Sequence, residues 1–411
     1  MSDMPRPPAW GRATALFANF FFIILAYYQV KAASRSLLIE YGGSGALPYA
    51  WVYSALTLVV VIAAYHVIVE RYERVRVVLA SLLVFAALLV MFRTLFTPDD
   101  IVSATAFYVF VDIFSVVLVE QFWSLTDSVS SADEGRKSFW FVGTGGLVGG
   151  VLGGLLASWL VTYTPLTTPD LLYACALLLL VVWALNLGMY RAGIYAEVHA
   201  APPREAGSWR VMFRNKYLVL IAVLLCCSQL AQPIVEFQFL NMAERQYVEL
   251  DVRTAFISEF FSILGLVSIA VNVVVTPVMH RLFGAIGGLM LQPLVLGVCS
   301  GLFYFSPTLW MAGAMKIGDR GLSYSINRAS KELLYIPVDP VLTYQAKAWI
   351  DMVGYRFFKG VGSGLILVAI NWLSPATMAM NLSWLTLAIC TVWVLAVAQV
   401  AQVYRSVLVR A

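Results

Sequence analysis

The stretch RAGIYAEVHAAPPREAGSWRVMFRNK, residues 191–216, is polar, rich in arginine and interrupted by a Pro-Pro pair. Apolar runs lie on both sides of it, and about 20 mainly apolar residues are enough for a helix to cross a bilayer. Six runs precede it, near 13–33, 46–67, 77–96, 101–125, 139–163 and 169–190, and six follow it, near 217–239, 252–279, 283–305, 308–326, 349–373 and 378–403. The sequence therefore predicts an all-α polytopic membrane protein of about 12 transmembrane helices, in two six-helix halves (1–190 and 217–411) joined by the central loop 191–216.

The composition agrees with a protein that lies mostly in lipid. Of 411 residues, 61% are hydrophobic and 12% are charged, and the mean hydropathy is +0.82, whereas soluble domains carry roughly 25% charged residues. The net charge of +4 is too small to indicate nucleic-acid binding. The cysteines fall inside apolar runs without metal-ligand spacing and the histidines are scattered, so we expect neither a metal site nor a cofactor. The N-terminus lacks a small-residue cleavage site, and we interpret the first run as a retained helix.

Lysine and arginine distinguish the two sides of the membrane, because cytoplasmic loops carry an excess of them. They precede the first span and follow every second span, at Arg6, Arg12, Arg71, Arg74, Arg76, Arg136, Lys137, Arg191, Arg204, Arg210, Arg214, Lys216, Arg281, Lys331, Lys347, Arg405 and Arg410. The opposite loops are poor in cations, apart from Arg245 and Arg253. We therefore expect a multi-pass protein of a bacterial inner membrane, with both termini and the central loop in the cytoplasm.

Two sets of six helices around a basic central loop are typical of major-facilitator-type transporters, whose halves surround a central cavity. A membrane-embedded transferase or scaffold is disfavoured, because the sequence has no metal-ligand cluster, nucleophile–base pair or soluble catalytic domain. We therefore expect a transporter, not an enzyme, and a monomer in the lipid bilayer.

The first span ends in AYYQVKAASRSLLIE (26–40), where Lys31 and Arg35 lie one helical turn apart with no acid between them. Ionisable groups within spans are costly and usually face a cavity or a partner, and two neighbouring cations would bind an anion. In the alternative interpretation both side chains extend to the membrane interface, because Lys31 is close to the predicted end of the span.

The seventh span contains CCSQLAQPIVEFQFLN (226–241), in which Glu236 lies among glutamines and follows Pro233. Proline removes a helical hydrogen bond and kinks the helix, and such breaks are tolerated where helices line a cavity. Two interpretations remain open for Glu236: a substrate or gating site, or a purely structural polar cluster.

The tenth span and its continuation, KIGDRGLSYSINRASKELLYIPVDP (316–340), carry a helical stripe that includes Arg320, Tyr324 and Lys331. We interpret Arg320 as following directly on an apolar span, which favours an anion contact within the membrane. For Lys331 the alternative is strong, because a solvated cytoplasmic helix with ion pairs would place it in the same way.

The eleventh span begins TYQAKAWIDMVGYRFFKGVGSG (343–364), in which Lys347, Asp351 and Lys359 lie on one helix face. Asp351 therefore has a cation on each side. This ladder of charges suits a gate in which Asp351 exchanges partners between conformations. An arrangement in which Asp351 stays fixed between the two lysines explains the spacing about as well.

The fifth span contains GTGGLVGGVLGGLLA (143–157). A phosphate loop is disfavoured, since no Lys-Ser/Thr follows and no strand precedes the glycines. Gly145, Gly149 and Gly153 form one ridge at helical spacing, and Gly146, Gly150 and Gly154 form a second. Small residues at this spacing predict close packing against a neighbouring helix.

Residues 321–364 resemble the signature of the ATP/ADP translocase family, the nucleotide carriers of intracellular bacteria and plastids. The matching positions are Tyr324, Ser325, Lys331, Glu332, Tyr335, Ile336, Pro337, Asp339, Lys347, Ala348, Ile350, Asp351, Lys359 and Ser363. FWSLTDSVSSADEGRKSFWFVGTGG (122–146) also resembles a family segment. QPIVEFQFL (232–240) places Glu236 on the family's helix-7 glutamate, and FISEFFSILG (256–265) places Glu259 on an acidic position. The chain departs from the family motif in the first span, where the second cation is displaced to Arg35.

The resemblance implies a major-facilitator-like fold and a secondary transporter that moves a nucleotide or a related phosphorylated, anionic solute by alternating access. We assign anion contacts to Lys31, Arg35, Arg320, Lys331 and Tyr324, and gating or coupling to Glu236, Glu259, Asp351, Lys347 and Lys359. The alternative is a major-facilitator permease, or a proton-coupled exporter of an unrelated small molecule, in which Glu236 or Glu259 carries the proton.

Overall fold

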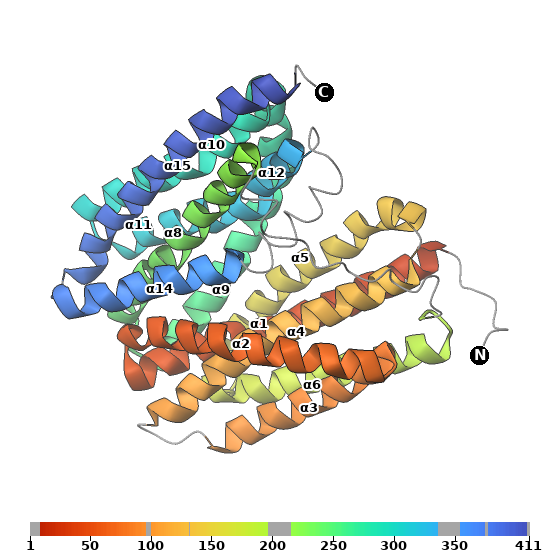
Figure 1. The fold of residues 1–411 in the computed structure, drawn as a ribbon. Coiled ribbons are helices and arrows are strands. Elements are labelled where there is room, and N and C mark those ends of the chain that lie inside the picture. Colours follow the sequence, from red (N-terminus) through yellow and green to blue (C-terminus); the bar gives the residue numbers. More distant parts are fainter. Residues whose placement is uncertain are drawn as a thin grey trace. The chain divides into compact units, whose positions relative to one another are not determined.

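Helices make up all the regular structure in the part of the chain that the computed structural model describes, residues 9–95, 100–130, 132–195, 215–335, 354–374 and 377–408 (Figure 1). In order they are α1 (Ala9–Gly42), η1 (Ser44–Ala46), α2 (Leu47–Arg71), α3 (Arg74–Leu95), α4 (Ile101–Val129), α5 (Ala132–Tyr163), η2 (Thr168–Asp170), α6 (Leu171–Arg191), α8 (Lys216–Gln246), α9 (Leu250–Ala270), η3 (Val271–Val275), α10 (Thr276–Phe305), α11 (Leu309–Leu322), η4 (Ser323–Asn327), α12 (Arg328–Tyr335), α14 (Tyr355–Trp372) and α15 (Met378–Leu408). The elements η1 and η2 are 3-10 turns, and η3 and η4 are π turns.

Nine helical segments among the described residues are long and apolar enough to cross a membrane. One of them runs from Leu250 to Phe305 over 56 residues and covers two predicted spans. Gly284 interrupts it with a left-handed φ of 64°, next to the boundary that the sequence predicts. The remaining predicted spans correspond to α14 and to α11, which has 14 residues and three charged side chains. The predicted all-helical, multi-pass architecture is therefore confirmed.

The first compact unit comprises residues 1–46, 56–204 and 247–265. Within it, α1 packs against α4, α5 and α6, and α3 packs against α4 and α6. Its core is rich in aromatic side chains. Phe85, Phe110 and Phe114 contact one another with ring centroids 5.4–6.0 Å apart, and such pairs stabilise a core beyond the area they bury.

Glycines of α5 determine how closely α1 approaches it. A Cβ atom at Gly149 would lie 2.4 Å from the carbonyl oxygen of Phe21 in α1, which is closer than real Cβ contacts. Gly145 and Gly153 face α1 in the same way, and Gly154, on the second ridge, faces α9. The close packing that the glycine spacing predicts is confirmed, and it fixes the position of α1 within this unit.

The second compact unit comprises residues 47–55, 205–246 and 266–411. Within it, α8 packs against α11, α14 and α15, and α10 packs against α11, α12 and α15 (Figure 1). Pro233 lies inside α8, and α14 comes close at this point, because a Cβ atom at Gly362 would lie 2.7 Å from Pro233 Cγ. The polar side chains of α8 that surround the proline are buried inside the unit.

The predicted central loop 191–216 is described only at residues 191–195 and 215–216, and its remainder lies outside the described residues. The division of the chain into two six-helix halves at this loop stays a prediction.

Candidate functional sites

Lys31 and Arg35 lie on one face of α1, as their spacing predicts, and both are half-buried. The Nζ atom of Lys31 lies 4.1 Å from the ring centroid of Tyr28 and 4.3 Å from that of Phe261 in α9. Arg35 Cζ lies 5.4 Å from the Phe261 ring and 5.7 Å from the Tyr108 ring in α4. Phe261 is therefore shared by both cations.

Aromatic rings hold the positive charges of Lys31 and Arg35 in place. An aromatic face attracts a cation through its quadrupole, by about 0.5–2 kcal/mol, and adds no formal negative charge. Arg35 Nη1 also donates a hydrogen bond of 2.7 Å to the carbonyl oxygen of Lys31, which fixes one turn of the helix. Aromatic rings and the helix backbone therefore hold the two cations side by side on α1.

Glu259 lies on α9 in the same unit, two residues before Phe261, and its side chain is exposed. The role in gating or coupling that the sequence suggests for Glu259 stays a prediction.

In the second unit, Glu236 of α8 forms an ion pair with Lys316 of α11. The side chains of these two residues are 10% and 1% exposed, respectively. Burying an ion pair is expensive unless both groups find good partners, and the pair therefore joins α8 to α11 deep inside the unit.

Asp319 lies one turn beyond Lys316 on α11 and is also buried. Gln292 of α10 donates a hydrogen bond of 3.0 Å to the backbone oxygen of Asp319 and a longer one, 3.4 Å, to Oδ1. Arg320 Nε lies 3.7 Å from Asp319 Oδ2. Three helices of this unit therefore contribute polar groups to one buried cluster, which we define as Glu236, Gln292, Lys316, Asp319 and Arg320.

Arg320 also contacts Tyr324, since Nη1 lies 3.3 Å from the phenol oxygen and Cζ lies 5.5 Å from the ring centroid. Tyr324 is 57% exposed and lies in the π turn η4. Lys331 of α12 and Lys359 of α14 are half-buried. The structure thus brings Arg320 and Tyr324 together, whereas the roles of Lys331 and Lys359 stay predictions.

Two predicted ladder residues, Lys347 and Asp351, lie outside the described residues. The ladder of charges in the eleventh span therefore stays a prediction as a whole.

Sequence reasoning missed Lys316, Asp319 and Gln292. The predicted stripe began at Arg320, and the two charged residues just before it, Lys316 and Asp319, were counted as part of an apolar span. A lysine and an aspartate three residues apart inside such a span would have been the signal, because both lie on one helix face and both are costly in lipid.

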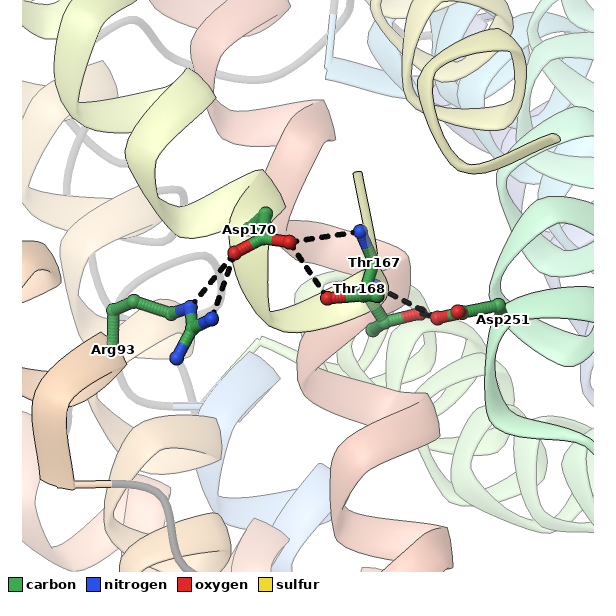
Figure 2. Close-up of polar contacts among 5 residues, drawn as sticks. All are labelled: Arg93, Thr167, Thr168, Asp170 and Asp251. Atoms are coloured by element: carbon green, nitrogen blue, oxygen red, sulfur yellow. Dashed lines mark hydrogen bonds and ion pairs between the residues drawn. The ribbon is translucent and has the colours of Figure 1, made fainter. Parts of the chain in front are cut away.

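A further polar network lies at one end of the first unit (Figure 2). Arg93 of α3 donates two hydrogen bonds, of 3.0 and 2.8 Å, to Asp170 Oδ1. Asp170 Oδ2 accepts from the backbone and hydroxyl of Thr167, and Asp251 of α9 accepts from the backbone and hydroxyl of Thr168 at 2.7 and 2.6 Å. The short turn η2 is thereby fastened to α3 on one side and to α9 on the other.

Comparison with known proteins gives two kinds of similarity. The model of the TLC ATP/ADP transporter family matches residues 99–317 and 305–404. ADP,ATP carrier protein 1 of Chlamydia muridarum is 25% identical over 456 residues, which cover 91% of this chain and 86% of the carrier. ADP,ATP carrier protein 1 of Chlamydia trachomatis is 24% identical with the same coverage.

Among solved structures, a point mutant of the nucleoside transporter NupG matches with a TM-score of 0.68 at 13% identity, covering 95% of this chain and 99% of that one. A bacterial homologue of the iron transporter ferroportin, in an inward-facing state, matches with a TM-score of 0.66 at 14% identity. The match covers 96% of this chain and 99% of the homologue. These structural similarities show the fold alone, which is that of major-facilitator-like transporters.

Proposed function

Since this chain belongs to the TLC ATP/ADP transporter family, we propose that it is a secondary transporter that moves a nucleotide, or a related phosphorylated anion, by alternating access. The family match covers most of the chain, and the relatives named ADP,ATP carriers align along most of their length. The single observation that carries the substrate class is the pair Lys31 and Arg35, held side by side on α1 with aromatic rings against them.

The chemistry of the pair fits a phosphorylated ligand. An arginine donates two parallel hydrogen bonds to phosphate oxygens, and a lysine adds a compact positive charge. In our proposal Lys31 and Arg35 are the anion contacts of the first unit. For the second unit we propose the same class of role for Arg320, Tyr324 and Lys331, on the strength of the family resemblance.

Gating and coupling are proposed for the charged groups of the second unit. Glu236 holds Lys316 within the cluster, and a buried ion pair of this kind suits a conformational switch, because either charge is costly to leave buried without the other. We propose the same class of role for Glu259, Lys359, Lys347 and Asp351, on the strength of the family resemblance.

The proposed location is a bacterial inner membrane, with both termini in the cytoplasm. The distribution of lysine and arginine between alternate loops supports this orientation. We further propose two six-helix halves joined at 191–216, a monomer as the working form, and no catalytic activity beyond transport.

Binding of radiolabelled ATP to the purified protein tests the proposal. We expect saturable binding that unlabelled ADP displaces and that an uncharged nucleoside does not. Binding of the nucleoside with undiminished affinity, and no binding of ATP, would instead favour a permease for a neutral solute.

A further inference from the structure

The buried cluster of the second unit contains two acids and two cations, and they are compensated unequally. Glu236 has a close partner in Lys316. Asp319 has Arg320 only at 3.7 Å from Oδ2 and Gln292 at 3.4 Å from Oδ1, and 3.4 Å is a long hydrogen bond. Asp319 is therefore the more weakly stabilised of the two carboxylates.

Two oxygen atoms in the cluster have no hydrogen-bond donor among the described residues, Asp319 Oδ2 and Gln292 Oε1. The side chain of Asp319 is 2% exposed, and Gln292 is fully buried. An ionised carboxylate this deeply buried depends on a nearby cation or on protonation. The titratable and charged groups around Asp319 are Lys316 and Arg320 on its own helix, Glu236 on α8 and Cys390 on α15.

Arg320 divides its contacts between a buried and an exposed partner. Its Nε lies 3.7 Å from Asp319 Oδ2, whereas its Nη1 lies 3.3 Å from the phenol oxygen of Tyr324, which is 57% exposed. An anion that binds the guanidinium through charge-assisted hydrogen bonds competes directly with Asp319 for the same positive charge.

We propose that Asp319 is a proton-binding site whose occupancy is linked to anion binding at Arg320. Without ligand, Asp319 is ionised beside Arg320. When an anionic substrate takes the guanidinium, the Asp319 carboxylate forms an O–H bond with one proton from water. The Glu236–Lys316 pair is unchanged in both states, so the cluster never holds an uncompensated charge. This inference rests on the proposed function, because it needs Arg320 to contact an anionic substrate.

Linkage gives the sign of the effect. If binding is accompanied by uptake of one proton, affinity is strongest at low pH and weakens as pH rises, by up to about tenfold per pH unit. By reciprocity, a proton on Asp319 favours the anion to the same extent. The protein would then move substrate and proton together.

The test measures ATP binding to the purified full-length protein between about pH 7.5 and pH 9, where phosphate groups are already ionised. We expect the Kd of the wild type to rise with pH and the Kd of Asp319→Asn to stay flat, because asparagine resembles the protonated acid. Asp112→Asn, a half-buried acid of α4 in the first unit, is the matched control and should keep the wild-type slope.

A second measurement needs no variant. Wild-type protein mixed with ATP in weakly buffered solution should take up about one proton per bound ATP, read with a pH-indicator dye. Equal pH slopes in wild type and Asp319→Asn, or binding without proton uptake, would overturn the coupling and leave the nucleotide assignment standing. A wild type that binds no ATP at any pH would overturn the proposed function, and the coupling with it.

Discussion

Arg253 of α9 pairs with Glu40 of α1, with 2.5 Å between Nη2 and Oε2, although 213 positions separate the two residues in the chain. The same Nη2 atom donates to the carbonyl oxygen of Ser36, and Nη1 lies 3.2 Å from the carbonyl oxygens of Tyr247 and Val248. The Arg253 side chain is 3% exposed. One guanidinium thus binds the end of α1 to the start of α9.

Arg253→Ala should therefore destabilise the protein substantially, by about 2–4 kcal/mol, because it removes several charge-assisted hydrogen bonds, including the buried one to the carbonyl oxygen of Ser36. Arg253→Lys should lie between Arg253→Ala and the wild type, since a lysine keeps the charge but not the forked geometry. Thermal unfolding of the detergent-solubilised protein measures the difference. Equal melting temperatures for Arg253→Ala and wild type would show that the pair is incidental.

Replacing each of two glycines of α5 by alanine should have opposite effects on the stability of the protein. Gly149→Ala places a Cβ 2.4 Å from a carbonyl oxygen of α1, so α1 must shift and the protein loses about 1–3 kcal/mol. At Gly143 no atom lies within 4 Å of the added Cβ, and alanine should be neutral or stabilising by up to about 1 kcal/mol through helix propensity. Unfolding temperatures of the two variants, measured side by side, test this; equal shifts would mean that the ridge does not set the packing.

The pair Glu236 and Lys316 should behave as a unit. Glu236→Gln or Lys316→Met alone leaves a buried charge without its partner and should cost about 3–5 kcal/mol. The double variant should cost clearly less than the sum of the two single costs. A double-mutant cycle on unfolding free energy gives the coupling directly, and additivity within about 0.5 kcal/mol would contradict the pairing.

The orientation can be tested by cysteine labelling. A cysteine at Ala200, in the arginine-rich loop, should resist an impermeant maleimide in intact cells and react after permeabilisation. A cysteine at Leu166, which is 37% exposed in the turn before η2, should react from outside. The reverse pattern would invert the proposed topology.

Hydropathy was enough to predict the helices, because span length and apolar composition are local properties that the bilayer imposes on each segment. It also predicted the break near Gly284, where a short gap in the apolar pattern coincides with a left-handed backbone. The glycine ridges of α5 were predictable for a similar reason, since three or four residues of spacing fix one helix face.

The partners of the charged residues were not predictable in the same way. Phe261 reaches Lys31 and Arg35 from α9, and Lys316 reaches Glu236 from α11, so each contact depends on tertiary packing. The stripe that begins at Arg320 also passes through the π turn η4, which changes the helical register, so regular spacing does not hold beyond Tyr324. The sequence therefore indicated which helices carry charged residues, whereas the partner of each charged residue depends on how the helices pack together.

We propose that the Lys31–Arg35 pair binds the nucleotide that this transporter carries, and uptake of radiolabelled ATP into ADP-loaded proteoliposomes tests this most directly. The wild type should accumulate label, whereas Arg35→Ala should bind ATP at least about thirtyfold more weakly, equivalent to about 2 kcal/mol, and lose uptake at low substrate. Arg71→Ala, at an exposed arginine that ends α2, is the matched control and should transport normally. Failure of the wild type to accumulate ATP, or undiminished uptake by Arg35→Ala, would contradict the claim.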